Sequence, residues 1–173
     1  LKKCDINQLV SDVHSQFTSP AELKGISVML DLPEGEIFAS VDREKVCKII
    51  VNLIGNAVKY AQSRIDIKLV SSDEGVRVSV SDDGPGIPDV EKRKVFEAFY
   101  QVKDGKSGAV GTGIGLAFSK SLAEAHHGTL SLEDSVYGGS SFVLTLPWGE
   151  EAVSEEPEVV IPDGREAADE EQG

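Results

Sequence analysis

The sequence is poor in cysteine and in long apolar stretches. It has only two cysteines, Cys4 and Cys47, whose spacing fits neither a disulfide framework nor a metal site and suits a reducing compartment. No apolar run approaches the length of a membrane span and no signal peptide is recognisable, so we expect no direct membrane contact by this domain. The single methionine is Met29, and the chain begins with Leu1 rather than an initiating methionine. We therefore expect the chain to be a piece of a longer protein.

Basic residues are scarce as well, since 17 Lys and Arg stand against 30 Asp and Glu and give a net charge of −13. Residues 149–173 contain ten acidic residues and one basic residue. This segment has two prolines and no apolar periodicity, which predicts an acidic disordered tail or linker. Residues 1–148, with 20 acidic and 16 basic residues, are long enough for one domain. Neither part has the basic face that nucleic acid requires, so no nucleic-acid partner is expected.

Apolar periodicity predicts three helices and six strands. Helices are expected over 5–17 after the N-cap Asp5, over 43–60 after the N-cap Asp42, and after the glycines at 111–116. Pro20 is expected to kink or interrupt the first helix. Strict alternation predicts strands at 26–32, 37–41, 65–69 and 76–80, with two more at 129–133 and 141–146.

The order of these elements predicts the fold class. Short turns between neighbouring strands favour antiparallel pairing, and the helices are enough to cover one face of a sheet. We therefore expect an α+β fold, a two-layer sandwich in which three helices cover one face of a mixed, mostly antiparallel sheet. Residues 83–110 combine glycines with charged residues and look too irregular for the core.

One candidate site is the run Gly111, Thr112, Gly113, Ile114, Gly115 and Leu116, which opens the third helix. Glycines at a helix start let a ligand approach the backbone, and the free N–H groups there suit an anion such as phosphate. The run matches neither the Walker loop nor the Rossmann fingerprint. A mobile glycine loop that merely caps the helix is an equally good interpretation of this run alone.

A second candidate site lies on the helix over 43–60. Asn52, Asn56 and Lys59 are spaced so that they share one face, apart from the apolar stripe. Two amide oxygens and an ammonium group suit a magnesium–phosphate ligand, because Mg²⁺ prefers oxygen donors and lysine offsets phosphate charge. The alternative is an ordinary solvated face, although asparagine is a poor helix former and two within one turn favour a function.

Asp82 is the third candidate. Val76, Val78 and Val80 point to one side of their strand, and the same period places Asp82 in line with the core. A carboxylate there needs a donor or an opening to water, and the amino group of a purine is such a donor. Alternatively the strand ends at Ser81 and Asp82 only begins the turn that follows.

Five motifs together resemble the sequence boxes of sensor histidine kinases. Residues 52–60 resemble the asparagine box, 82–88 the first glycine box, 95–101 the phenylalanine box, 111–116 the second glycine box and 138–142 a last, weaker one. They occur in the family's order, and the resemblance covers roughly residues 5–147. It implies the catalytic and ATP-binding domain of a histidine kinase, with the Bergerat-type ATP-binding fold that gyrase, heat-shock chaperones and mismatch-repair proteins share.

The resemblance implies a role for each matched residue. Asn56 would ligate Mg²⁺ with help from Asn52, and Lys59 and Tyr60 would contact the phosphates and nucleotide of ATP. Asp82 would accept from the adenine amino group, and residues 83–110 would form a mobile lid. The residues implied to line the rest of the nucleotide site are Gly84, Gly86, Ile87, Phe99, Lys103, Gly111, Thr112, Gly113, Ile114, Gly115 and Leu116. Gln101 departs from the basic residue that kinases of this family often carry there, and Lys103, Lys106 or Lys120 could supply the charge.

The resemblance also implies partners for the domain. It would transfer the ATP γ-phosphoryl group to a histidine on the dimerisation domain of the same parent, as a cytoplasmic part of a membrane-anchored kinase. The tail would tether a downstream response-regulator receiver domain. No histidine here has the sequence context of the phosphoacceptor.

Three different functions compete with that of a histidine kinase. A stand-alone ATPase is less favoured, because that branch places a water-activating Glu where Asn52 stands. A non-catalytic nucleotide-binding module is disfavoured by the intact motifs, although the departure at Gln101 is compatible with it. A serine-directed kinase of the same fold is the third competing function.

Overall fold

The computed structural model describes residues 1–100 and 115–149 of the chain. Its α-helices are α1 (Ile6–Leu23), α2 (Arg43–Tyr60) and α3 (Gly115–Ala125), and two short 3₁₀ turns, η1 (Asp89–Glu91) and η2 (Lys94–Phe96), precede α3. The strands are β1 (Lys2–Asp5), β2 (Ser27–Asp31), β3 (Phe38–Val41), β4 (Arg64–Ser72), β5 (Gly75–Asp82), β6 (Thr129–Asp134) and β7 (Ser140–Pro147).

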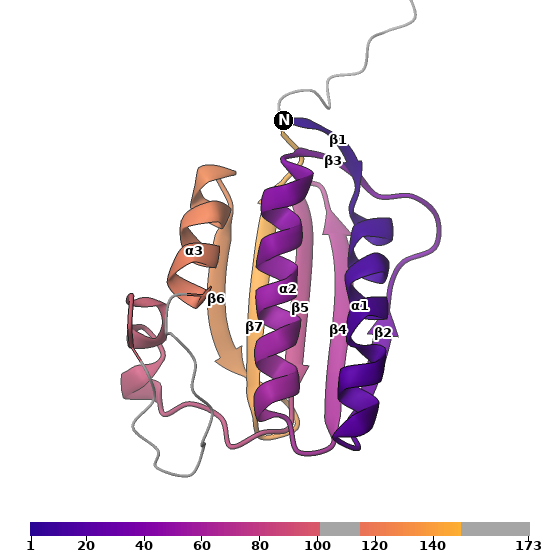
Figure 1. Cartoon of the computed structure of the whole chain (residues 1–173). Helices are drawn as coiled ribbons and strands as arrows, with labels where there is room; N and C mark the ends of the chain where they lie inside the picture. Colours follow the sequence, from indigo (N-terminus) through magenta and orange to yellow (C-terminus); the bar gives the residue numbers. More distant parts are fainter. Residues whose placement is uncertain (101–114, 150–173) are drawn as a thin grey trace, which may run out of the picture.

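Five of the strands form one mixed sheet in the order β2-β4-β5-β7-β6. β2 and β4 are parallel, while the other neighbouring pairs are antiparallel. The three helices lie side by side on one face of this sheet (Figure 1). The predicted fold class, a mostly antiparallel sheet with three helices on one face, is confirmed.

The pairing of β2 and β3 differs from the hairpin that short connections favour. β3 pairs antiparallel with β1 in a separate two-stranded sheet, with Lys3 opposite Ser40. β2 instead pairs with β4, with Leu30 opposite Ile67. The turn after β2 therefore leads the chain from one sheet to the other.

Helix α1 continues through Pro20 to Leu23, so the predicted interruption is wrong. Proline removes one backbone N–H near the end of the helix, where few later bonds depend on it. Ala21, one residue further on, is 1% exposed, and its carbonyl accepts from the N–H groups of Lys24 and Ile26. Buried Ala21 and the two bonds to its carbonyl hold this last turn, and Gly25 follows the helix with a positive φ of 72°.

Helix α2 lies at the centre of the core. Its inward stripe is at most 1% exposed and consists of Val46, Ile49, Ile50, Leu53, Ile54 and Ala57. Burial of each larger aliphatic side chain contributes roughly 1.5–3 kcal/mol to folding. The Asp42 side chain accepts from the N–H of Lys45 and caps the helix, as predicted. This packing fixes the orientation of α2 and so of the flanking side on which the candidate metal residues lie.

Hydrogen bonds attach the end of the described part of the chain to strands β3 and β4. Ser40 of β3 donates its N–H to the carbonyl of Trp148, and the Trp148 indole N–H donates to the Ser72 carbonyl at 3.0 Å. The predicted tail lies outside the described residues from position 150 onward. Within the described ranges no helix is both long and apolar enough to cross a membrane.

Candidate functional site

Asn52 links α2 to the start of α3. Its side-chain Nδ2 donates to the Gly115 carbonyl at 3.0 Å and to the Ser119 hydroxyl at 2.8 Å. Since a carbonyl only accepts, the atom that faces Gly115 must be the amide nitrogen, and Oδ1 is the atom left to accept a ligand. A Cβ added to Gly115 would lie 3.3 Å from that Oδ1. The glycine thus leaves room for the Asn52 amide.

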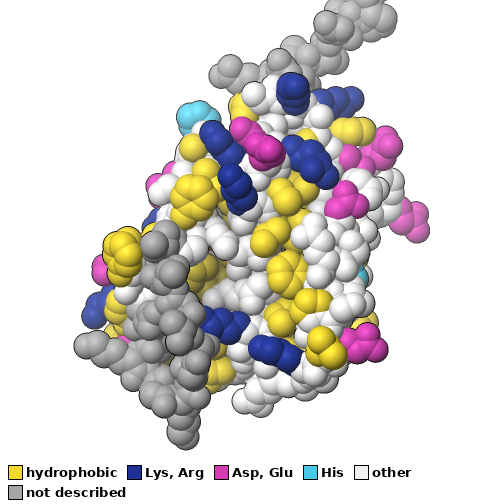
Figure 2. Space-filling view, viewed as in Figure 1, with side chains coloured by type: hydrophobic (Ala, Val, Ile, Leu, Met, Phe, Trp, Pro, Cys, Tyr) yellow, Lys and Arg dark blue, Asp and Glu magenta, His cyan; other side chains and the backbone are white. Residues whose placement is uncertain are grey.

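Asn56 and Lys59 follow Asn52 on the same side of α2, Tyr60 is the last residue of the helix, and each is half-buried. The Lys59 ammonium lies 5.3 Å from the centre of the Tyr60 ring. Figure 2 shows that basic side chains lie toward the two ends of the helix-covered face, with apolar side chains along its middle. A face that carries both basic and apolar side chains suits a ligand with charged and aromatic parts.

Asp82 is the last residue of β5 and is 2% exposed. Its Oδ1 accepts from the N–H of Gly84 at 2.9 Å and from the N–H of Ser140 at 3.2 Å. Among the described residues, no donor reaches Oδ2. Burial raises the pKa of this carboxyl, and the two N–H groups only partly offset that effect. The strand continues to Asp82, so the expectation of a carboxylate in line with the core is confirmed.

Two glycines lie close to the Asp82 carboxylate, and a third packs against the loop that contains one of them. A Cβ on Gly139 would lie 2.4 Å from Oδ1 of Asp82, and one on Gly84 would lie 3.0 Å from the same atom. Gly86 has a positive φ of 73°, and its Cβ would lie 3.2 Å from the Gly138 carbonyl. The backbone itself therefore forms the wall beside Asp82, which only residues without a side chain allow. Ile87 follows and packs against the core.

Asp83 is a structural residue of this site that the sequence analysis missed. Its carboxylate accepts from the backbone N–H groups of Gln62, Ser63 and Arg64 at 2.9–3.1 Å and from the Ser63 hydroxyl. Partial burial opposes ionisation, but these donors outweigh it and hold the pKa of Asp83 well below its usual range. Asp83 thus fixes the turn between α2 and β4, directly beside Asp82.

Residues 89–100 are more ordered than the irregular sequence suggests. Val95 is 5% exposed, and the Phe96 ring packs edge-on against Phe142 of β7 at 6.2 Å. Lys120 of α3 holds its ammonium 5.2 Å from the Phe96 ring, so in this structure its charge lies at the phenylalanine box. Phe99, by contrast, is 74% exposed and has a positive φ of 65°.

Polar contacts also tie this segment together. The Tyr100 hydroxyl donates to Glu91, and this hydrogen bond raises the pKa of Tyr100 to about 12. Lys92 bridges Asp89 of η1 and Asp134 of β6, the latter at 2.7 Å. These contacts attach the start of the proposed lid to the sheet.

Several predicted site residues lie outside the described residues. They are Lys103, Gly111, Thr112, Gly113 and Ile114, together with Gln101, Lys106 and the second part of the proposed lid. Gly115 and Leu116, which begin α3, are described, and Leu116 packs against the core. The structure brings the start of α3 against Asn52 and the loop before β7 against Asp82.

The donor set at α2 fits a hard divalent cation. Within the described ranges, no group of three or more His, Cys, Asp or Glu residues could hold a metal. A cation here would take its protein ligands from amide oxygens, namely Oδ1 of Asn52 and of Asn56, and the rest from water and phosphate. Mg²⁺ suits such a site, because it keeps several waters and binds through few protein ligands.

Comparison with known proteins identifies the relatives of this fold. Residues 41–150 match the family model for histidine kinase-, DNA gyrase B- and HSP90-like ATPases. The sensor histidine kinase TmoS of Ectopseudomonas mendocina is 37% identical over 84% of this chain, and CpxA of Escherichia coli K12 is 31% identical over 82%. The chain spans only 15% and 31% of the lengths of these two relatives.

Solved structures show the same architecture. The catalytic domain of histidine kinase ThkA superposes with a TM-score of 0.76 at 25% identity and covers 85% of this chain and 97% of that domain. Full-length ShkA, solved in complex with AMPPNP, gives 0.75 at 30% identity and covers 86% of this chain and 31% of ShkA. This chain therefore belongs to the family of histidine kinase-, DNA gyrase B- and HSP90-like ATPases, and its described part has the fold of a histidine kinase catalytic domain.

Proposed function

We propose that this chain binds ATP with Mg²⁺ and transfers the γ-phosphoryl group to a histidine on the dimerisation domain of its parent protein. The observation that carries the proposal is Asp82, a buried carboxylate with one oxygen fixed by Gly84 and Ser140. Burying a carboxylate costs free energy, and its presence beside glycine backbone favours a ligand that supplies the missing donor. ShkA, whose solved structure contains AMPPNP, supports a nucleotide as that ligand.

Asp82 is proposed to accept a hydrogen bond from the exocyclic amino group of adenine through Oδ2. Gly84, Gly86 and Ile87 would line the base, since glycine leaves the backbone accessible to a flat ring. Phe99, which is exposed in this structure, would contact the nucleotide only after moving toward it. A guanine base, with a carbonyl oxygen where adenine has its amino group, would place an acceptor against the carboxylate and bind poorly.

The phosphates are proposed to lie along the outward face of α2. Asn56 and the Oδ1 atom of Asn52 would hold Mg²⁺, which when bound neutralises phosphate charge. Lys59 and Tyr60 would contact the phosphates and nucleotide, with Lys103 as a further cation. The run from Gly111 to Leu116 would offer backbone N–H groups at the N-terminus of α3.

Transfer is favoured over hydrolysis by the chemistry of Asn52. Its Nδ2 hydrogens are committed to Gly115 and Ser119, and an amide is no base at neutral pH. Nothing at this position can take a proton from water, so an external nucleophile that needs no such base is favoured. An imidazole nitrogen on a separate domain is such a nucleophile.

The proposal extends to the parent protein of this domain. The parent would be a two-component sensor kinase, and the domain would lie on the cytoplasmic side of a membrane-anchored protein. Residues 149–173, acidic and proline-bearing, would form a spacer to a receiver domain. A parent sequence without a receiver domain after this segment would refute the proposal that it is such a spacer.

Phosphotransfer in trans tests the function. The chain is incubated with labelled ATP, Mg²⁺ and the helical dimerisation domain of its parent, with Asn56→Ala as the negative control. We expect an acid-labile, base-stable label on a histidine of that domain, no label on the chain itself, and very slow release of free phosphate. Brisk hydrolysis without transfer would favour a stand-alone ATPase, and ATP binding with neither reaction would favour a non-catalytic module.

A further inference from the structure

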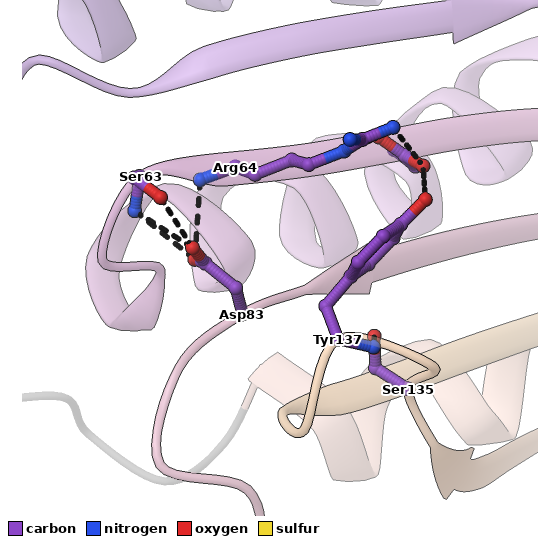
Figure 3. A network of polar contacts seen from close by, with 6 residues as sticks. Ser63, Arg64, Asp83, Ser135 and Tyr137 are labelled. Atoms are coloured by element: carbon purple, nitrogen blue, oxygen red, sulfur yellow. Dashed lines mark hydrogen bonds and ion pairs between the residues drawn. The ribbon is translucent and has the colours of Figure 1, made fainter.

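A polar network connects the loop before β7 to strand β4 (Figure 3). The Tyr137 hydroxyl donates to Oδ2 of Asp66 at 2.5 Å, and Arg64 pairs with Oδ1 of the same carboxylate at 2.9 Å. The Arg64 guanidinium also lies 4.4 Å from the centre of the Tyr137 ring. The hydrogen bond with Asp66 raises the pKa of the Tyr137 hydroxyl from its ordinary value, which already lies well above neutral pH.

The loop that carries Tyr137 is closed on itself. The Ser135 N–H donates to the Gly139 carbonyl at 2.8 Å, and the Gly138 N–H donates to the Ser135 carbonyl at 3.1 Å. The Tyr137 N–H donates to the Ser135 hydroxyl at 3.2 Å. Because these bonds make the loop one small unit, the Tyr137 side chain anchors all of residues 135–139 to β4.

The far end of this loop forms the wall of the Asp82 site. Gly139 lies so close to Asp82 that a Cβ would come within 2.4 Å of its Oδ1, and the Ser140 N–H donates to that same atom. The direction in which Asp82 presents Oδ2 therefore depends on where Gly139 and Ser140 are held. Strand pairing with β6 holds Ser140 from within the sheet, and Tyr137 ties the loop before it to β4 from outside the core.

A second anchor reaches Asp82 from the other side and meets the first at Arg64. The Arg64 backbone N–H donates to Asp83 at 3.1 Å, while the Arg64 side chain bonds Asp66. Arg64 thus takes part in both anchors, through its backbone N–H to Asp83 and through its side chain to Asp66. Exposed ion pairs of this kind contribute little to stability. The network is therefore better explained by its positioning of the backbone around Asp82.

We propose that Tyr137, together with Asp66 and Arg64, is a positioning set that holds Gly139 and Ser140 against Asp82 and so sets discrimination between purine bases. This inference rests on the proposed function, because it takes Asp82 as the group that reads the exocyclic amino group. Loss of the Tyr137 hydroxyl lets the loop move and weakens the fixed geometry around Oδ1. The base contact suffers, while the phosphate contacts on α2 do not.

Calorimetry with two nucleotides tests the proposal on the full chain. Adenosine diphosphate and inosine diphosphate differ at the base, since inosine has a carbonyl oxygen in place of the amino group. Tyr137→Phe should lower the adenosine-over-inosine affinity ratio by about threefold to tenfold, the range that one net hydrogen bond supplies. Asp66→Ala should have the same effect, and the double variant should add little to it, because both changes break one link. Val136→Ala, in the same loop and 90% exposed, is the matched control and should keep the ratio.

The outcomes separate this inference from the proposed function. If Asp82→Asn changes the ratio but Tyr137→Phe leaves it unchanged, Asp82 reads the base and the positioning set is refuted alone. An Asp82→Asn variant that keeps the wild-type ratio refutes the proposed base site and the inference together. Equal weakening of both nucleotides by Tyr137→Phe would show a merely structural role and would also overturn the inference.

Discussion

The side-chain amide of Asn52 donates a hydrogen bond of 2.8 Å to the hydroxyl of Ser119, and this contact joins helix α2 to helix α3 inside the candidate site. Ser119 is fully buried at 0% exposure. Asn52 is therefore both a structural link and a candidate ligand, because its Nδ2 serves the first role and its Oδ1 is left for the second. A carboxylate at position 52 would face the Gly115 carbonyl with an acceptor and lose that bond, and it could only accept from the Ser119 hydroxyl.

Ser119→Ala is expected to lower the free energy of unfolding by about 1 kcal/mol, because it leaves a half-buried amide N–H without its partner. Urea denaturation of Ser119→Ala, Asn52→Ala and the double variant measures the coupling between the two residues. Ser121→Ala is the control, since Ser121 lies on the exposed side of α3 and donates to the Ala117 carbonyl within its own helix. Additive effects of the two single changes would show that the contact contributes nothing.

Asn56→Ala is expected to weaken ATP binding in the presence of Mg²⁺ by about tenfold or more, as loss of a metal-site group commonly does. Binding without Mg²⁺ should change much less, because the base and lysine contacts remain. Calorimetry of both forms with and without the metal measures the effect, and Lys48→Ala, near the other end of α2, is the control. Equal, metal-independent binding by both proteins would refute the metal assignment.

Asp82→Asn is expected to raise stability at pH 7 while it damages base recognition. Burial raises the folded-state pKa of Asp82 above the ordinary value of 3.8, so the folded state binds a proton more readily than the unfolded state. Stability therefore falls as pH rises from the ordinary pKa to the raised folded-state pKa of Asp82. At neutral pH the buried, ionised carboxylate lowers the free energy of unfolding. The gain from Asp82→Asn should shrink as pH falls through the raised pKa, which urea denaturation at pH 7 and pH 4 would measure.

The same variant is expected to reverse the base preference. In Asp82→Asn the Oδ1 atom can keep the bonds from Gly84 and Ser140, and Nδ2 then points where Oδ2 was. An N–H donor there should favour the carbonyl oxygen of inosine over the amino group of adenosine. Calorimetry with the two diphosphates measures the reversal, and an unchanged preference for adenosine contradicts it.

Asp83→Ala is expected to cost roughly 1–2 kcal/mol of unfolding free energy at neutral pH, because several backbone N–H groups lose a charged acceptor. The folded-state pKa of Asp83 is lowered, so its stabilisation is present above the ordinary carboxyl pKa and is lost as pH falls toward the depressed one. The destabilisation should therefore disappear in strong acid. Thermal unfolding between pH 7 and pH 2 measures it, with exposed Asp73→Ala as control, and a cost that does not depend on pH would contradict the assignment.

Features that depend on local periodicity could be predicted from the sequence. The alternation of Val76, Val78 and Val80 carries on to Asp82 because the pleat has a period of two, and all four residues are buried. As helix caps, Asp5 and Asp42 accept from the N–H groups of Asn7 and Lys45, which are near them in the sequence. Residues one helical turn apart share a face, so Asn52 and Asn56 were placed together without any knowledge of the fold.

The sequence by itself thus determined the helices, most of the strands, the caps and the order of the candidate site residues. Only the tertiary structure decided that β2 pairs with β4, that Asp83 holds the start of β4, and that Tyr137 reaches Asp66. It also decided that the His126 ring accepts the N–H of Asp42, 84 positions earlier in the chain. Helical and strand periods are set by neighbouring residues, whereas these contacts join groups that only the packed chain brings within hydrogen-bond distance.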